Sequence, residues 1–151
     1  LKNKLVGYGK SDLLCYRAEK ESDLTEIQSK SWDPLLQWMH YQFNVNFKVS
    51  YGIMPVEQTS DLESTLSKLI APIDSLALTA VNDIVTFSGS LVIGLTIFKG
   101  RLKPENAWTV IRIDEDWQRE RWGNLDEQLV EDNINKTMFM HACRILKIVQ
   151  K

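Results

Sequence analysis

The densest group of chemically active side chains lies in RIDEDWQRERWGNLDE, residues 112–127, where carboxylates are mixed with arginines and tryptophans. Asp114, Glu115 and Asp116 are adjacent in this segment. Neighbouring carboxylates can act as general acids and bases, or they can bind a divalent cation. They can also form a solvated helix face or a surface that holds a partner protein.

A helical conformation would separate these three acids. Successive residues of an α-helix diverge by about 100°, so only positions three or four apart share a face. On a helix over 104–122, we expect Asp116 to point to the exposed side and pair with Arg112. We expect Glu115 to pair with Arg119, four residues further along. Exposed pairs of this kind stabilise a helix by only a few tenths of a kcal/mol.

Asp114, Glu115 and Gln118 differ from Asp116 because the same helix places them in or beside an apolar sector. That sector is formed by Ala107, Trp108, Ile111 and Trp122. A carboxylate among apolar side chains must be neutralised, paired or partly hydrated. One interpretation is an intramolecular partner, such as a helix N-terminus, a lysine, Arg17 or Arg144. The other is a set of polar anchors on an otherwise apolar binding surface.

Carboxylate pairs provide an enzymatic alternative. Asp116 and Glu120 are four residues apart on one expected helix, and Glu127 and Glu131 are four apart on the next. Two such pairs could hold Mg²⁺ for nucleotide hydrolysis. However, Asp116 and Glu120 flank arginines and face away from the aromatic sectors, which favours the binding interpretation.

Other catalytic signals are missing from the sequence. It contains no glycine-rich phosphate loop and no CxxC, HExxH or GxSxG motif. His141 and Cys143 are two residues apart on one expected helix, so their side chains diverge and form a poor nucleophile–base pair. His40 and His141 are expected to be packed or surface histidines, and Cys15 and Cys143 to be reduced thiols. We therefore expect no catalytic residue, metal ligand or cofactor.

Composition limits the class of protein. The chain has 151 residues, 44% hydrophobic and 25% charged, with a net charge of −2. This is enough for one domain with its own core, and it provides no overall positive field to attract nucleic acid. The longest apolar run, 91–98, is too short to span a bilayer. We expect no nucleic-acid partner, no membrane insertion and a monomer.

Hydrophobic periodicity predicts a mainly α-helical single domain over 1–151, with about five helices and one or two short strands. Helices are expected from Ser22 onward with a kink or restart at Asp33-Pro34, from Ser60 (capping box with Glu63) to Ile70, over 76–98, over 104–122 and over 126–149. The alternation in 44–50 predicts a strand. The segment 76–98 could instead form two strands, IVTF and LVIGLTIF, because β-branched residues are frequent there.

Five segments together resemble the ATP12 chaperone family, also called ATP synthase F1 complex assembly factor 2. They are DLLCYRAE (12–19), SWDPLLQW (31–38), YGIMPV (51–56), FSGSLVIGL (87–95) and RIDEDWQRERWGNLDE (112–127). The resemblance runs in order from about residue 8 to 150 and covers only the helical C-terminal part of the family. The β-rich N-terminal part of the family is absent from this chain.

The resemblance implies a non-enzymatic assembly chaperone. Such a protein binds the unassembled α subunit of the ATP synthase F1 sector, shields its β-facing surface and releases it during assembly. The expected client-binding residues are Asp114, Glu115, Gln118 and Trp122. The expected structural motif residues are Trp32, Asp33, Pro34, Arg112 and Gly123. A helical interaction domain with another client remains an alternative, and the expected location is a bacterial cytoplasm or, alternatively, the mitochondrial matrix.

Overall fold

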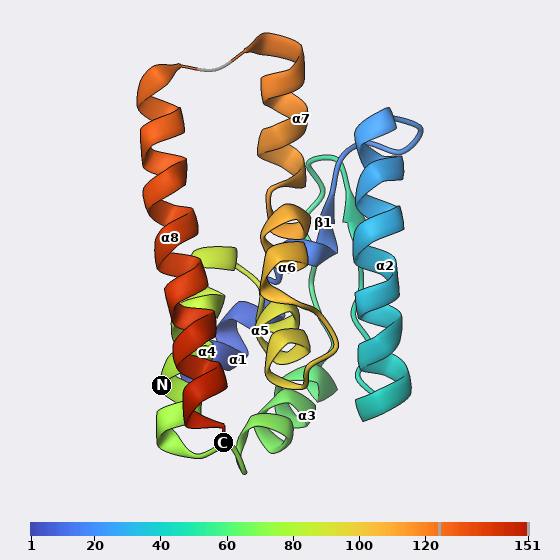
Figure 1. The fold of residues 1–151 in the computed structure, drawn as a ribbon. Helices are drawn as coiled ribbons and strands as arrows, with labels where there is room; N and C mark the ends of the chain where they lie inside the picture. Colours follow the sequence, from blue (N-terminus) through green and yellow to red (C-terminus); the bar gives the residue numbers. More distant parts are fainter. Residues whose placement is uncertain (124, 151) are drawn as a thin grey trace.

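The chain folds into a bundle of α-helices, seen here in a computed structural model that describes residues 1–123 and 125–150 (Figure 1). The helices are α1 (Lys2–Lys10), α2 (Asp23–Phe43), α3 (Ser60–Ile70), α4 (Ser75–Ser88), α5 (Leu91–Phe98), α6 (Pro104–Ile111), α7 (Ile113–Trp122) and α8 (Asp126–Val149). A short 3₁₀ turn, η1 (Leu13–Cys15), precedes β1 (Tyr16–Arg17), which pairs in parallel with β2 (Ser50–Tyr51). The mainly α-helical prediction is confirmed, but the described part contains eight α-helices rather than about five.

Helix α5 is the central element of the core. Every residue from Leu91 to Ile97 is buried, and α5 packs against α1, α2, α4 and α6. Gly94 allows this packing, because a Cβ atom there would lie 2.7 Å from a methyl group of Val85 on α4. A helix that is apolar on all sides must be covered on all sides, so the other helices are arranged around it.

The prediction of one helix over 76–98 is wrong, and so is its two-strand alternative. Helix α4 ends at Ser88, Gly89 follows with φ of 73°, and Ser90 caps the new helix by accepting a hydrogen bond from the N–H of Ile93. A left-handed glycine is a common end to a helix. The apolar periodicity of the two helices hides this break.

Asp12, far away in sequence, stabilises the break. Its carboxylate is fully buried and accepts hydrogen bonds from the Ser90 hydroxyl and from the backbone N–H groups of Val92 and Leu14. The carboxylate therefore lies at the N-terminus of α5, where free N–H groups and the helix dipole favour negative charge.

The prediction of one helix over 104–122 is also wrong, although by a single residue. Arg112 adopts φ of −99° and ψ of 8°, so α6 ends at Ile111 and α7 begins at Ile113. Because the helix is interrupted at Arg112, the side chains of α7 point in other directions than they would on one continuous helix over 104–122, and they contact different partners.

Other local expectations gave mixed results. The helix over 126–149 is confirmed by α8, and Pro34 lies inside a continuous α2. The strand over 44–50 is wrong except for its last residue, since residues 44–49 have no regular structure. The capping box is wrong too, because Thr59 precedes α3 and makes no side-chain cap bond.

Trp32 and Asp33 connect α2 to the rest of the bundle. Trp32 is fully buried, and its indole N–H donates to the carbonyl of Val110 at 3.0 Å. Arg17, itself buried, places a guanidinium nitrogen 2.9 Å from an Asp33 carboxylate oxygen and lies over the Trp32 ring. Pro34 is exposed. These contacts fix α2 against α6 and β1.

None of the helices in residues 1–123 and 125–150 could span a membrane. Each is too short or too polar for a transmembrane segment.

Removal of the Asp12 carboxylate should destabilise the fold. Asp12→Ala leaves three buried donors, on Leu14, Ser90 and Val92, without their acceptor. We expect the free energy of unfolding in urea to fall by about 2–4 kcal/mol. Asp74→Ala, which removes an exposed cap of α4, is the control and should cost about 1 kcal/mol. Equal losses in the two variants would contradict the special role of Asp12.

Asp12 should also give the stability a pH dependence. Burial raises the pKa of Asp12 from 3.8 to about 6, although its hydrogen-bond donors oppose the shift. A raised carboxyl pKa means that the folded state binds the proton more tightly, so this contribution is present below pH 4 and is lost as pH rises through 6. Relative to Asp12→Ala, the wild type should lose about 3 kcal/mol between pH 3 and 7, of which about 2 kcal/mol is lost between pH 4 and 6. Urea unfolding at several pH values tests this, and parallel curves would refute it.

Candidate functional site: the cleft between α7 and α8

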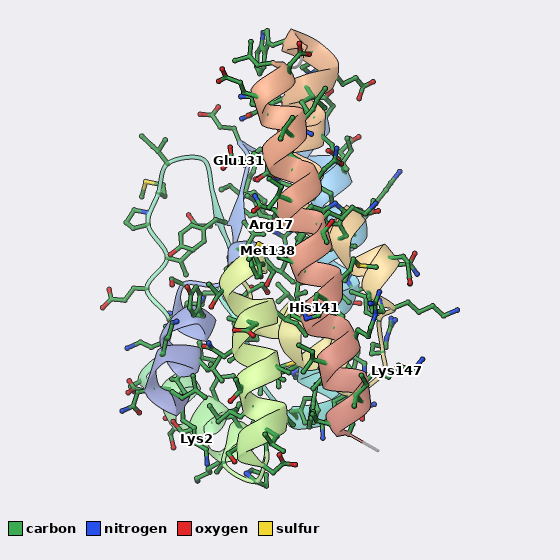
Figure 2. The ribbon with its side chains drawn as sticks, turned by 60° about the vertical axis from the view of Figure 1, so that its left-hand side comes forward. Lys2, Arg17, Glu131, Met138, His141 and Lys147 are labelled. Atoms are coloured by element: carbon green, nitrogen blue, oxygen red, sulfur yellow. The ribbon has the colours of Figure 1, made fainter. Side chains whose placement is uncertain are left out.

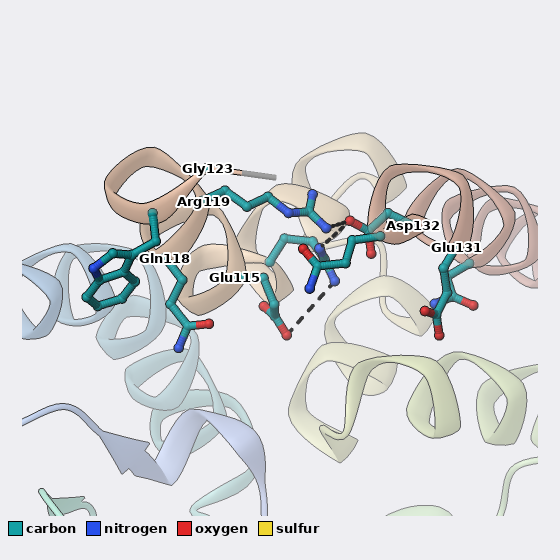
Figure 3. Close-up of a pocket in the computed structure, with 10 residues that line it drawn as sticks. Glu115, Gln118, Arg119, Gly123, Glu131 and Asp132 are labelled. Carbon is teal, nitrogen blue, oxygen red and sulfur yellow. Dashed lines mark ion pairs between the residues drawn. The ribbon is translucent and has the colours of Figure 1, made fainter. Parts of the chain in front are cut away.

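Helices α7 and α8 extend side by side at one end of the bundle (Figure 1), and their side chains line a cleft (Figure 3). Its volume is about 440 Å³. It is lined from the α7 side by Arg112, Glu115, Gln118, Arg119, Trp122 and Gly123, and from the α8 side by Gln128, Glu131, Asp132 and Asn135. Three of the predicted client-binding residues (Glu115, Gln118 and Trp122) and two of the predicted motif residues (Arg112 and Gly123) therefore meet in one place. Asp114 and the Trp32-Asp33-Pro34 group do not line it.

Asp132 holds the base of the cleft together. Its carboxylate lies 3.0 Å from an Arg112 guanidinium nitrogen and also pairs with Arg119 (Figure 3). The side chains of Asp132, Arg112 and Arg119 are only 19%, 14% and 21% exposed. Partly buried charges of opposite sign attract each other more strongly than exposed ones, because less water screens them. This cluster therefore fixes the spacing of α7 and α8.

The ion pairs expected within α7 are wrong. Glu115 pairs with Arg112, with 3.9 Å between the charged atoms, and not with Arg119. Arg112 and Arg119 both turn to Asp132 on α8 instead. Asp116 is exposed and has no ion pair within the described residues. The physical reason is the phase change at Arg112, together with the weaker screening by water around the partly buried Asp132 carboxylate on the neighbouring helix.

Asp114 faces α2 rather than the cleft. The side-chain amide of Gln28 donates to an Asp114 carboxylate oxygen at 2.7 Å, while the Gln28 carbonyl oxygen accepts from the N–H of Ala18 at 2.8 Å. Gln28 is buried and Asp114 is half-buried. The intramolecular partner of Asp114 is thus an amide, and not one of the arginines, lysines or helix ends considered from the sequence.

Trp122 stands at the rim of the cleft with 74% of its surface exposed. Its ring meets Trp117 edge to face, with 5.8 Å between centroids. Arg121 covers the Trp117 ring at 4.3 Å and pairs with Asp23 on α2. An exposed tryptophan with a supported ring is well suited to anchor a partner, because it buries a large area for little loss of conformational freedom.

The sequence analysis missed Asp132 and the role of Arg119. The sequence does contain a pattern that singles out Asp132, because a helical wheel of α8 places it on the same face as Phe139 and Cys143, which are buried. The test that singled out Glu115, a carboxylate in an apolar sector, would also have selected Asp132.

Metal-dependent catalysis gains no support from the structure. Within residues 1–123 and 125–150, no three His, Cys, Asp or Glu side chains form a group that could hold a metal ion. Of the two expected carboxylate pairs, only Glu131 lines the cleft. Burial raises the pKa of Cys15 and of Cys143 to about 12, so both buried thiols stay protonated and unreactive at neutral pH.

The structure thus shows a helical bundle with a cleft between α7 and α8, which has paired charges at its base and an exposed tryptophan at its rim. Comparisons with known proteins relate the chain to one family. The model of the ATP12 chaperone protein family matches residues 1–40. Over 141 residues the chain is 27% identical to the mitochondrial protein atp12 of Schizosaccharomyces pombe, covering 88% of this chain and 48% of that protein.

Solved structures give the same result over almost the whole chain. The crystal structure of Atp12 from Paracoccus denitrificans superposes with a TM-score of 0.91 and 33% identity, covering 97% of this chain and 63% of that one. The Atu1473 protein of Agrobacterium tumefaciens superposes with a TM-score of 0.88 and 29% identity, covering 99% of this chain and 56% of that one. The chain is thus similar to proteins of the ATP12 chaperone family, and it spans between about half and two thirds of the length of these relatives.

Loss of the Asp132 carboxylate should loosen the cleft. Asp132→Ala leaves Arg112 and Arg119 partly buried without their shared partner. We expect a loss of roughly 1–3 kcal/mol in the free energy of unfolding, less than for a fully buried pair because these groups keep some water. Asp126→Ala, an exposed acid in the first turn of α8, is the control and should change stability by less than about 1 kcal/mol. An unchanged stability for Asp132→Ala, measured by urea unfolding, would contradict the cluster.

Proposed function

We propose that this chain is the client-binding helical part of an assembly chaperone that holds the unassembled α subunit of the ATP synthase F1 sector. In this proposal it covers the surface that will later face the β subunit, and it releases the subunit without catalysis. The observation that carries the proposal is the α7–α8 cleft, which gathers Glu115, Gln118 and the exposed Trp122 in a chain similar to proteins of the ATP12 family.

The geometry supports reversible binding. The charges at the base of the cleft are already paired within the chain. A bound client would therefore remove little further water from them, while they keep the cleft in a fixed shape that orients the client. Trp122 offers apolar area, and the exposed Glu115 and Gln118 offer polar anchors at its side. A contact of this modest size would be displaced by the larger, better-packed interface between assembled subunits.

The predicted client-binding residues would play two roles. Glu115, Gln118 and Trp122 would touch the client. Asp114 would act through the position of α7, because it is hydrogen-bonded to Gln28 on α2. Gly123 would end α7 in a conformation, φ of 78° and ψ of −177°, that essentially only glycine adopts.

Two broader parts of the proposal rest on the family. We propose that residues 1–151 form one helical domain that works together with the β-rich part found in the family. The compartment would be a bacterial cytoplasm or the mitochondrial matrix, and the chain would act as a monomer. A helical domain that binds a different client is the competing function.

A client-binding assay tests the function itself. The isolated F1 α subunit is held under conditions where it aggregates, and light scattering is followed with and without the full-length chaperone. We expect suppression of aggregation and a complex in size-exclusion chromatography. Suppression of an unrelated aggregating protein to the same extent would favour the competing function, and no suppression of the α subunit would reject the proposal.

A charge reversal tests the cleft. Glu115→Lys places a cation beside Arg112 and removes a polar anchor at the surface. We expect binding of the α subunit to weaken by about tenfold or more, with an unchanged melting temperature. Asp116→Lys makes the same charge change one residue away, outside the cleft, and should bind normally. Equal binding by both variants would show that Glu115 has no role in client contact, and unfolding of the Glu115 variant would assign Glu115 a structural role instead.

A further inference from the structure

A row of apolar side chains runs along the outward face of α8. Val130, Ile134 and Met138 are 61%, 55% and 49% exposed, and Ile145 continues the row at 37%. Steps of four, four and seven residues keep them on one face over about 22 Å of helix. We call Val130, Ile134, Met138 and Ile145 the α8 stripe. Its side chains are separate from the residues of the α7–α8 cleft.

The stripe borders a hollow rather than a flat surface. In its C-terminal half, Thr137, Met138, His141 and Ile145 face Asp83, Thr86 and Phe87 on α4 across a depression of about 430 Å³. Figure 2 shows α8 at the front of the molecule with α4 beside its C-terminal half, and Met138 and His141 labelled along α8. A ridge of apolar side chains from a partner helix would fit such a groove.

The charges around the stripe are acidic. Glu127 and Glu131 flank its N-terminal end, and Asp83 lines the hollow from α4. None of these three carboxylates has an ion pair within residues 1–123 and 125–150. Two bases of the same helix, Arg144 and Lys147, line a different pocket with α6, and His141 is the basic side chain that lines the hollow.

From this arrangement we propose that the α8 stripe is a docking groove for an amphipathic helix whose apolar face is flanked by lysine or arginine. The inference rests on the proposed function, because it names a second element of the client that the chaperone covers. Apolar contact along the stripe would supply affinity, and the unpaired carboxylates would select basic flanks and fix the direction of the helix.

The stripe and the cleft can serve one client. The cleft and the N-terminal half of the stripe use different faces of the same stretch of α8, since Glu131 lines the cleft while Val130 and Ile134 line a separate hollow. One client could therefore contact both surfaces at this end of α8. Two weak contacts on one partner strengthen each other, because the second forms at high effective concentration.

Peptide binding tests the groove directly. The full-length chaperone is titrated into a fluorescein-labelled 18-residue helical peptide with a leucine face and lysine flanks, and anisotropy is recorded. A peptide with the same leucine face and glutamate flanks is the comparison. We expect the lysine peptide to bind at least about tenfold more tightly. Equal binding of the two peptides, or none, would overturn the proposal.

Variants locate the binding. The double variant Ile134→Ser, Met138→Ser should lose about tenfold in affinity for the lysine peptide. Leu76→Ser, on an equally exposed leucine of α4, should bind like the wild type. Asp83→Lys with Glu127→Lys should abolish the preference for lysine flanks, whereas Glu26→Lys with Glu57→Lys, an equal change in net charge elsewhere, should leave it intact. All these positions are exposed, so the substitutions should leave the melting temperature unchanged. The exception is Met138, whose surface is about half buried, so its replacement by serine should lower the melting temperature slightly.

Two further outcomes separate the proposals. If the stripe variant still suppresses aggregation of the α subunit and still binds the peptide, the groove is not used and the proposed function stands. If the wild type binds the lysine peptide but fails to protect the α subunit, the groove is real and the client assignment is wrong. Concentration-dependent dimerisation in sedimentation velocity, lost in the stripe variant and accompanied by no peptide binding, would assign the stripe to a second copy and overturn the proposal.

Discussion

The buried Asp12 carboxylate at the start of α5 is the constraint on which the rest of the bundle depends. It accepts hydrogen bonds from Leu14, Ser90 and Val92, so it joins the N-terminal segment to the turn between α4 and α5. That turn directs α5 through the centre of the core, where α1, α2, α4 and α6 pack around it. A buried charge is costly unless its partners are complete, and here the free N–H groups of a helix terminus complete them.

The cleft is built on this core but held by a different interaction. Helix α8 packs along α4 through its C-terminal half, while its N-terminal half extends beside α7 (Figure 1). Asp132 links the two helices through Arg112 and Arg119, and Gln28 holds Asp114 at the first turn of α7. The charged groups of this cluster are thus paired within the chain, whereas Trp122 and the α8 stripe leave apolar surface exposed. Exposed apolar patches mark interaction sites, so this arrangement agrees with the proposed role of covering apolar surface and releasing it.

Sequence periodicity was most reliable where one helix had a single buried face and clear ends. The bounds of α8 agree with the expected 126–149, and α2 continues through Pro34, so the restart that was one of the two expectations there does not occur. It failed where two helices met end to end, at Gly89 and at Arg112, because apolar residues on both sides conceal a break. The wheel correctly separated Asp114 from Asp116, yet it assigned Arg112 and Arg119 to the wrong carboxylates. Partners on another helix compete with neighbours on the same helix, and a helical wheel contains only the latter.

The sequence by itself determined the helical class, the family resemblance and the set of residues that deserved examination, because these follow from local periodicity and from motifs contiguous along the chain. Tertiary structure alone decided that Glu115, Gln118 and Trp122 share a cleft with Asp132, and that Asp114 turns to Gln28. It also decided that no other part of residues 1–123 and 125–150 covers the α8 stripe, which composition cannot reveal. The reason is physical: burial and pairing depend on which helices are neighbours in space, and this is fixed by the packing around α5 rather than by spacing along the chain.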